Sequence, residues 1–211
     1  MNSIKTRIQE SQHEQQAFKM NSDNPLEIAR ILCAFANTQG GRLLIGVKEN
    51  GKITGTLPEE ERHRIEEIAK SFCQPAVKFT THEWQEDFRL VLEVLVAPNS
   101  NHFVTAKDEN ADWKSYIRFE DATLKANKIQ LKLWKLEQQP IEKPLLFKER
   151  ESTFLKTLSD YSKPVNLSKL YKLLESYSKK DIDNSLAMLI HWEMINWKYE
   201  DDAFKYFITK Y

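Results

Sequence analysis

Residues 25 to 47 constrain the fold most strongly, because they join a helix that is apolar on nearly every side to a short apolar strand. Asp23-Asn24-Pro25 supplies a helix cap followed by proline at the first helical position. Leu26 to Ala36 is apolar around most of the helical circumference, which is typical of a buried helix. Gly40-Gly41 allows the left-handed turn that ends a helix, and Leu43 to Val47 predicts a central strand.

The flanking segments predict a mixed sheet backed by helices, which makes the fold class α+β. Glu49-Asn50-Gly51 reads as a hairpin turn, and a second, amphipathic helix ends before Pro75. The remaining elements predicted for this first domain, residues 1–138, are a return strand at 52–55, a helix at 59–72, strands at 76–82, 88–97 and 113–119, and a last helix at 122–138.

Two prolines, Pro140 and Pro144, discourage helix and predict a stiff linker over 139–148. A second domain then covers 149–211. We predict helices at 149–161, 167–176 and 179–192, followed by strands at 194–199 and 204–209 around the turn at 200–202. Three helices followed by a hairpin is the order of a winged helix-turn-helix.

Composition limits the function classes less than the motifs do. With 211 residues, the chain is long enough for two modest domains, and 31 basic residues balance 31 acidic ones. This balance counts against a strong phosphate binder, although a local basic patch is compatible with it. Cys33 and Cys73 lie too far apart for a paired-thiol metal site. Because the sequence shows neither a signal peptide nor a run long enough to span a membrane, we predict a cytoplasmic protein without membrane contact.

The stretch Ala34-Phe35-Ala36-Asn37-Thr38-Gln39-Gly40-Gly41-Arg42-Leu43-Leu44-Ile45-Gly46-Val47 resembles the signature of the Schlafen-type AlbA-like domain. That family is described as DNA-binding and occurs in many bacterial regulator-like proteins. The resemblance runs from residue 10 to about 125 and includes Phe18-Lys19, Ile53-Thr54-Gly55, Pro75 and Tyr116-Ile117-Arg118. It implies nucleic acid as the partner. The signature residues themselves are Asn37, Thr38, Gly40, Gly41 and Gly46.

The signature has two readings. Asn37 and Thr38 can bond the backbone groups freed at the helix end, while Gly40-Gly41 permits a tight reversal, so we interpret the segment mainly as architecture. The alternative is that exposed amides at this turn also contact phosphate.

Schlafen proteins that cut RNA are expected, from the same resemblance, to carry carboxylates before and after this region. Aligned without gaps, those positions hold Gln12, Ala17 and Lys48, of which Ala17 and Lys48 cannot ligate a divalent cation. Glu10, Glu14 and Glu49 lie nearby in sequence and can substitute only if the alignment slips. We therefore predict a protein that is not an enzyme, with a metal-dependent RNA nuclease as the alternative.

The family is also often described as ATP-binding. The sequence has no glycine-rich loop ending in Gly-Lys-Ser or Gly-Lys-Thr, and Gly40-Gly41 precedes a strand whereas a phosphate loop follows one. We predict no cofactor and no metal.

Candidate nucleic-acid contacts in the first domain are basic side chains that can gather around Arg118, where Tyr116 and Phe119 are available for stacking. A solvated sheet face explains the same charges equally well. The candidates are Lys19, Arg42, Lys48, Lys52, Lys114 and Arg118.

In the second domain the predicted recognition helix begins at Ser178, with Ile182, Leu186, Leu189 and Ile190 facing inward. The candidates for DNA contact are Lys179, Lys180, Asn184 and Ser185. Asp181 and Asp183 oppose this reading by repelling phosphate, and winged helices also serve as docking modules.

Aromatic residues crowd the C-terminal hairpin, and we expect most of them to be core, with any exposed ones marking a dimer surface. They are Trp192, Trp197, Tyr199, Phe204, Tyr206, Phe207 and Tyr211. The sequence thus predicts a cytoplasmic bacterial transcription regulator that binds DNA rather than RNA, chiefly by backbone contacts, as a homodimer. A protein-interaction module that touches no nucleic acid is the third alternative.

Overall fold

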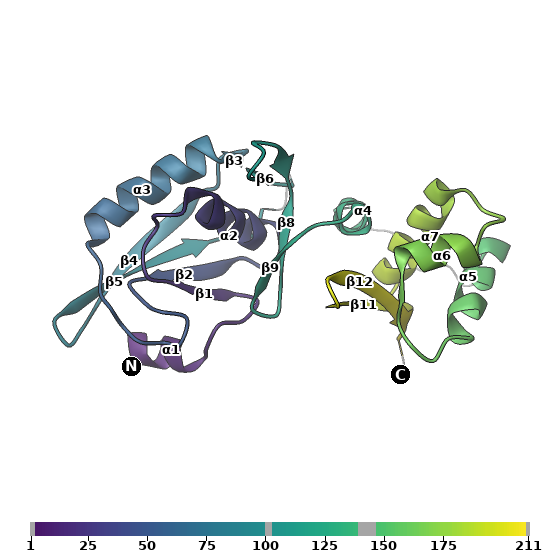
Figure 1. Cartoon of the computed structure of the whole chain (residues 1–211), viewed down its shortest axis with the longest axis horizontal. Coiled ribbons are helices and arrows are strands. Elements are labelled where there is room, and N and C mark those ends of the chain that lie inside the picture. The colour runs from purple at the N-terminus through teal and green to yellow at the C-terminus, as the bar shows by residue number, and fades with distance from the viewer. Residues whose placement is uncertain (1–2, 100–102, 139–146, 210–211) are drawn as a thin grey trace. The chain divides into compact units, whose positions relative to one another are not determined.

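The computed structural model describes residues 3–99, 103–138 and 147–209, and the chain divides into two compact units, Met1–Ala126 and Asn127–Tyr211 (Figure 1). Helix α4 (Lys128–Glu137), which the sequence placed in the first domain, belongs to the second unit, because Ile129 and Leu136 pack into its core. The predicted boundary at residue 138 therefore lies too far along the chain. The predicted linker, 139–148, lies outside the described residues except for Phe147 and Lys148.

The first unit is built on a four-stranded sheet with the order β1-β2-β5-β4. Strands β1 (Gln16–Lys19) and β2 (Gly41–Ile45) are parallel, whereas β5 (Arg89–Val96) pairs antiparallel with both β2 and β4 (Phe79–Glu86). The predicted α+β class, the mixed sheet and the central place of the strand after Gly40 are confirmed.

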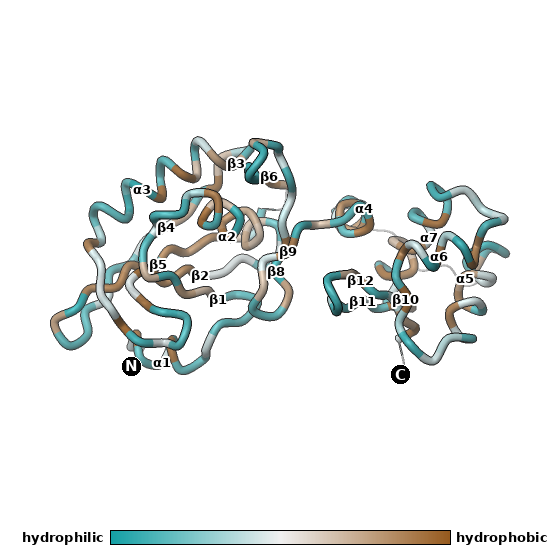
Figure 2. Tube along the Cα trace, in the orientation of Figure 1, coloured by the Kyte–Doolittle hydropathy of each residue, from teal (hydrophilic) through white to brown (hydrophobic). Residues whose placement is uncertain are grey.

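Helices cover both faces of this sheet. Helices α2 (Pro25–Asn37) and α3 (Pro58–Ser71) share a core with one face, and α1 (Ile4–Gln9) packs on the other. The far side of α2 contacts β6 (Thr105–Lys107) and β8 (Tyr116–Phe119). Because α2 has cover on both sides, its apolar character on nearly every side is accounted for, and Figure 2 shows the resulting apolar centre.

Shorter strands complete the unit. Strand β3 (Cys73–Gln74) pairs with β6, which pairs with β7 (Trp113–Lys114), and β8 forms a hairpin with β9 (Ala122–Lys125). The prediction of a helix from 122 was wrong for its first residues, because they pair with β8, and Asn127 caps the helix that follows. The predicted return strand at 52–55 is reduced to a single bridge between Val47 and Ile53.

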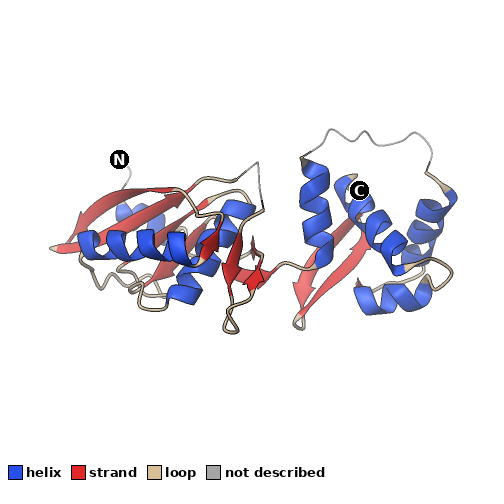
Figure 3. Ribbon diagram, turned by 90° about the horizontal axis from the view of Figure 1, so that it is seen from above, coloured by secondary structure: helices blue, strands red, loops and turns tan. Residues whose placement is uncertain are grey.

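The second unit has the element order predicted for it, preceded by α4. Helix α5 (Glu149–Ser159) leads through β10 (Val165–Asn166) to α6 (Leu167–Leu173) and α7 (Lys179–His191) (Figure 3). The hairpin of β11 (Ile195–Glu200) and β12 (Ala203–Ile208) follows, and the sheet order is β10-β12-β11.

The hairpin aromatics mostly serve the core, as expected. Tyr206 is fully buried, and Trp192, Trp197 and Phe204 pack against the same cluster. Tyr211 lies outside the described residues. None of the helices described for this chain is both long enough and apolar enough to cross a membrane.

Candidate nucleic-acid interface

A cleft opens in the first unit where β1 and β2 end, beside the start of α2. Its wider part, of about 550 Å³, is lined by Phe18, Lys19, Met20, Asn21, Asn24, Glu27, Ile28, Lys48, Glu49 and Asn50. An adjoining part, of about 390 Å³, is lined by Gln12, Ala17, Lys19, Glu27, Arg30, Ile31, Glu49, Arg118, Asp121 and Thr123. Lys19, Glu27 and Glu49 line both parts, so we call the whole the Lys19 cleft.

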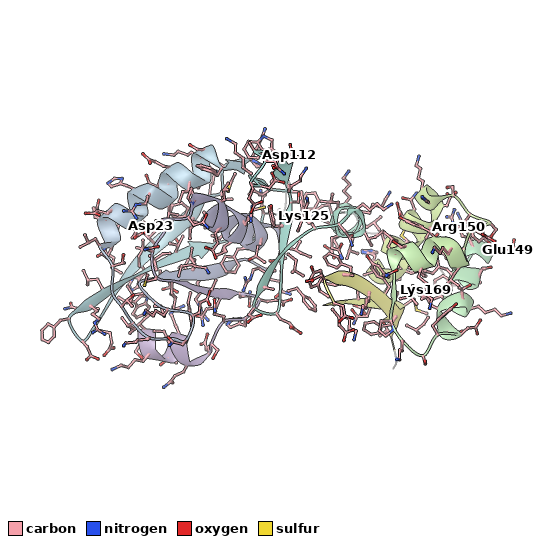
Figure 4. The ribbon with its side chains drawn as sticks, viewed as in Figure 1. Asp23, Asp112, Lys125, Glu149, Arg150 and Lys169 are labelled. Atoms are coloured by element: carbon pink, nitrogen blue, oxygen red, sulfur yellow. The ribbon has the colours of Figure 1, made fainter. Side chains whose placement is uncertain are left out.

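Local structure explains why the cleft forms there. The parallel pairing of β1 with β2 brings the carboxyl ends of both strands to one edge, which is where open α/β sheets place ligands. Helix α2 begins beside that edge, and the Asn24 side chain accepts a hydrogen bond from the Glu27 amide at 3.2 Å. Asp23, labelled in Figure 4, precedes the cap and pairs with Arg64 at 2.8 Å.

Lys19 sits between two carboxylates. Its Nζ lies 2.6 Å from Glu27 and 3.3 Å from Glu49, and only 19% of the side chain is exposed. Burial alone lowers the pKa of Lys19, but hydrogen bonding and attraction to the two carboxylates outweigh burial and raise it. Lys19 therefore stays charged and offsets one of the two carboxylate charges that flank it.

Arg118 forms a wall of the cleft and is not the exposed cation that the sequence predicted. It is only 4% exposed, lies 5.4 Å over the Phe35 ring, and donates to the carbonyls of His13, Glu14 and Gln16. Burial lowers the pKa of Arg118. The prediction of a surface patch around Arg118 is wrong, because the hydrogen bonds of this guanidinium fasten the segment before β1 to the β8–β9 hairpin.

The other predicted cations of this unit do not gather into one patch. Arg42 pairs with Glu10 and donates to Gln16 at 2.6 Å, and Lys114 pairs with Asp112 at 3.0 Å. Lys48 is exposed and lines the wide part of the cleft. Of the predicted cations, the fold thus brings Lys19, Lys48 and the buried Arg118 to the cleft, and Lys48 is the exposed one of these three.

The polar side chains of the signature are used by the fold. Asn37 is 7% exposed; its amide donates to the carbonyls of Val104 and Tyr116, both at 2.9 Å, and accepts from the Val104 amide at 2.7 Å. The Thr38 hydroxyl donates to the Ala34 carbonyl at 2.8 Å. Asn37 thereby joins the end of α2 to the segments at 104 and 116.

The signature glycines are needed for close approach. A Cβ on Gly41 meets the Phe35 ring at 2.3 Å, and one on Gly40, whose φ is +75°, meets the Val96 carbonyl oxygen at 2.7 Å. Gly46 adopts a φ of +97° at the end of β2. The Gly40-Gly41 turn is therefore required by the close packing of the chain against Phe35 and Val96.

The positions where a nuclease needs carboxylates converge on the cleft. Gln12 and Ala17 line its narrow part and Lys48 its wide part. The three carboxylates that could substitute at these positions are dispersed. Glu10 pairs with Arg42 near the start of β2, whereas Glu49 pairs with Lys19 beyond the end of β2. Glu14 is exposed. Within residues 3–99, 103–138 and 147–209, no three His, Cys, Asp or Glu side chains form a group able to hold a metal ion.

Comparison with protein families assigns the first unit. The family model described as Schlafen, AlbA_2 matches residues 5–127, more than half of the chain and nearly all of the first unit. This chain belongs to the Schlafen AlbA_2 family. Membership of this family indicates a function related to nucleic acid, without specifying which nucleic acid or which role.

Two solved structures are similar to the chain. The DIP2311 protein from Corynebacterium diphtheriae has a TM-score of 0.45 at 13% identity over 82% of this chain and 32% of its own. The N-terminal domain of a RecG-related protein from Nitrosomonas europaea has a TM-score of 0.41 at 16% identity over 71% of this chain and 97% of its own. This chain thus spans about a third of the length of the Corynebacterium protein. No curated protein sequence matches it.

Sequence reasoning missed three charged side chains of the Lys19 cleft. Glu27 and Arg30 lie at an i, i+3 spacing on one face of α2, and Arg30 stacks over Tyr116 at 5.5 Å. Asp121 follows β8 in the hairpin turn. The spacing puts Glu27 and Arg30 on one face, but only the tertiary fold turns that face toward the end of β1.

In the second unit the structure separates the four predicted contacts on α7. Lys179, Lys180 and Asn184 are exposed, whereas Ser185 is 1% exposed and its hydroxyl donates to Glu151 at 2.9 Å. Ser185 is therefore wrong as a DNA contact, because it faces the core. Ser178 caps the helix as predicted, accepting from the Asp181 amide at 3.1 Å.

Proposed function

We propose that this chain is a non-catalytic protein that binds nucleic acid, DNA in preference to RNA, by contacts to the phosphate backbone. The observation that carries the proposal is the Lys19 cleft of the AlbA_2 domain, whose wide part offers hydrogen-bond donors from the side chains of Lys48, Asn21 and Asn50. Lysine and amide donors of this kind hold phosphate and sugar groups without reading base sequence.

Charge in the cleft supports the same function. Glu27 and Glu49 would repel phosphate, but Lys19 pairs with both and offsets one of their two negative charges. Lys48, at the rim, forms no ion pair in the described parts of the chain. The rim therefore supplies an unneutralised cation to an incoming phosphate.

The second unit supports DNA as the preferred nucleic acid. Its order of helices, followed by the β11–β12 hairpin, is compatible with the predicted winged helix-turn-helix, and helix-turn-helix motifs dock on duplex DNA. Lys179 and Lys180 are exposed where α7 begins. A transcription regulator that joins an AlbA_2 domain to a winged helix accounts for both units.

Metal-dependent RNA cleavage is the second candidate, since Glu49 and Asp121 line the cleft together with Gln12 and Ala17. We rank it below binding, because Lys19 Nζ lies between Glu27 and Glu49 and competes with a cation for their oxygens. Incubating the protein with structured RNA and manganese tests it directly, and cleavage that Glu49→Ala abolishes would replace our proposal.

The proposal itself is tested by electrophoretic shift with duplex DNA and with RNA of the same length at two salt concentrations. We expect binding at low salt that weakens steeply at high salt, and tighter binding of DNA. Lys48→Glu should reduce the affinity, whereas Lys70→Glu, an equal charge change at an exposed position of α3 outside the cleft, should not. Absence of binding at low salt refutes the proposal and favours a protein-interaction module.

The homodimer, the role in transcription, the cytoplasmic location and the bacterial origin stay predictions. Light scattering of the purified chain tests the dimer.

A further inference from the structure

The face of α7 that a winged helix inserts into DNA is occupied by α4. Lys128 Nζ lies 2.7 Å from Asp183, and Lys132 donates to the Asn184 side chain at 2.6 Å. Ile129 is fully buried in the same core as Ala187, which is also fully buried. While α4 is in place it covers Asp183 and Ala187, so α7 cannot enter a groove of the duplex along this face.

The contacts between the two helices run in chain order. Lys128 meets Asp183, Lys132 meets Asn184, and Glu137 lies near enough to His191 for electrostatic attraction. Helices α4 and α7 therefore lie side by side in the same direction. The N-terminal half of α4 borders the end of α7 that carries Lys179 and Lys180.

Lysines line this border. Lys128, Lys132 and Lys135 follow an i, i+4, i+7 spacing, which places them on one face of α4. Because Lys132 on that face donates to Asn184 of α7, the row of three lysines runs alongside α7. We call the set Lys128, Lys132, Lys135, Lys179 and Lys180 the α4–α7 lysine ridge.

Most of the ridge is not neutralised. Asp183 is 5% exposed and takes up the charge of Lys128, with the Tyr171 hydroxyl as a second donor at 2.5 Å. Asp181 is bound by Arg150 at 3.0 Å, from α5, where Figure 4 labels that arginine. Over the described residues, no carboxylate pairs with the four remaining lysines of the ridge, Lys132, Lys135, Lys179 and Lys180.

We propose that the second unit binds nucleic acid along the α4–α7 lysine ridge, by phosphate contact, and that the face of α7 does not read bases. This inference rests on the proposed function and assigns it a surface. Lys128 to Lys135 spans about 10 Å of helix, the axial length over which one DNA strand presents about three phosphates. The length of the ridge along α4 thus matches that of about three consecutive phosphates of one DNA strand, and α4 keeps the face of α7 that it covers away from the bases.

The test uses the full chain, a labelled 20-base-pair duplex and a salt series. The variant Lys132→Glu with Lys135→Glu should weaken binding at least tenfold at low salt and reduce the slope of log affinity against log salt by about 2. The control carries Lys156→Glu and Lys163→Glu, two exposed positions outside the ridge, and should change affinity less than twofold. A second pair, Lys132→Gln with Lys135→Gln, keeps hydrogen-bonding capacity toward Asn184 and should weaken binding in the same direction if charge is the cause.

Three outcomes contradict the inference, and they can be told apart. If the unaltered chain binds no DNA, the proposed function fails and the ridge fails with it. If the unaltered chain binds and both Lys132/Lys135 variants bind equally well, only the ridge is refuted. If Asn184→Ala changes which duplex sequence is preferred, α7 reads bases and α4 is displaced on binding.

Discussion

Replacing Asn37 by alanine tests whether the family signature is architecture or a contact surface. The Asn37 side chain makes three short hydrogen bonds to backbone groups of Val104 and Tyr116 while almost completely buried. Each such bond contributes about 1 kcal/mol net, and the buried partners keep their desolvation cost when the side chain is removed. The Cys33 thiol donates to the Val104 oxygen as well, at 3.2 Å, which moderates the loss. We expect the first unit to lose about 3 kcal/mol of unfolding free energy.

That loss is a large share of the roughly 5–15 kcal/mol that stabilises a typical domain. The assay is urea unfolding followed by tryptophan fluorescence, with hydrogen exchange of β2 and β5 peptides to assign the transition to the first unit. Asn24→Ala is the matched control, because it makes the same change at the other end of α2, where an exposed cap contributes about 1 kcal/mol.

The reasoning is refuted if Asn37→Ala costs no more than Asn24→Ala. A variant that keeps its stability but loses DNA affinity would show instead that the signature amide contacts nucleic acid.

Four further outcomes are expected. Gly41→Ala should lower the free energy of unfolding by about 1–3 kcal/mol, because its Cβ overlaps the Phe35 ring, and a thermal melt measures this. Arg118→Ala should destabilise the first unit by about 3 kcal/mol through lost charged hydrogen bonds; an unchanged melt with weaker DNA binding would restore Arg118 as a surface contact. Ser185→Ala should cost about 1–2 kcal/mol by removing a buried hydrogen bond and leave DNA affinity unchanged, and a drop in affinity contradicts its burial. Burial raises the pKa of Cys73 to about 12, so the neutral thiol is favoured in the folded state. The stability that this provides is complete below the unfolded pKa of about 8.5 and is lost as pH rises toward 12. Because other buried groups, such as Tyr206, also titrate at high pH, the measurement is the difference in urea midpoint between the unaltered chain and Cys73→Ser, which should shrink over that range; a constant difference contradicts the reasoning.

Local chemistry determined much of the fold. The Asn24 cap, the proline after it and the Gly40-Gly41 turn set the bounds of α2 and the start of β2, because each acts on its own backbone neighbours. The order of elements in the second unit was readable for the same reason. Helix periodicity and turn residues are local signals, and they do not depend on what packs nearby.

Tertiary packing decided the rest, above all which charged and polar groups are exposed. Arg118 and Ser185 lie on elements that the sequence predicted correctly, yet both are buried, because their partners come from residues 13–16 and from α5. Helix α4 belongs to the second unit because its apolar face is buried against α7. The Lys19 cleft and the lysine ridge likewise arise from contacts between segments far apart in sequence, which no periodicity records.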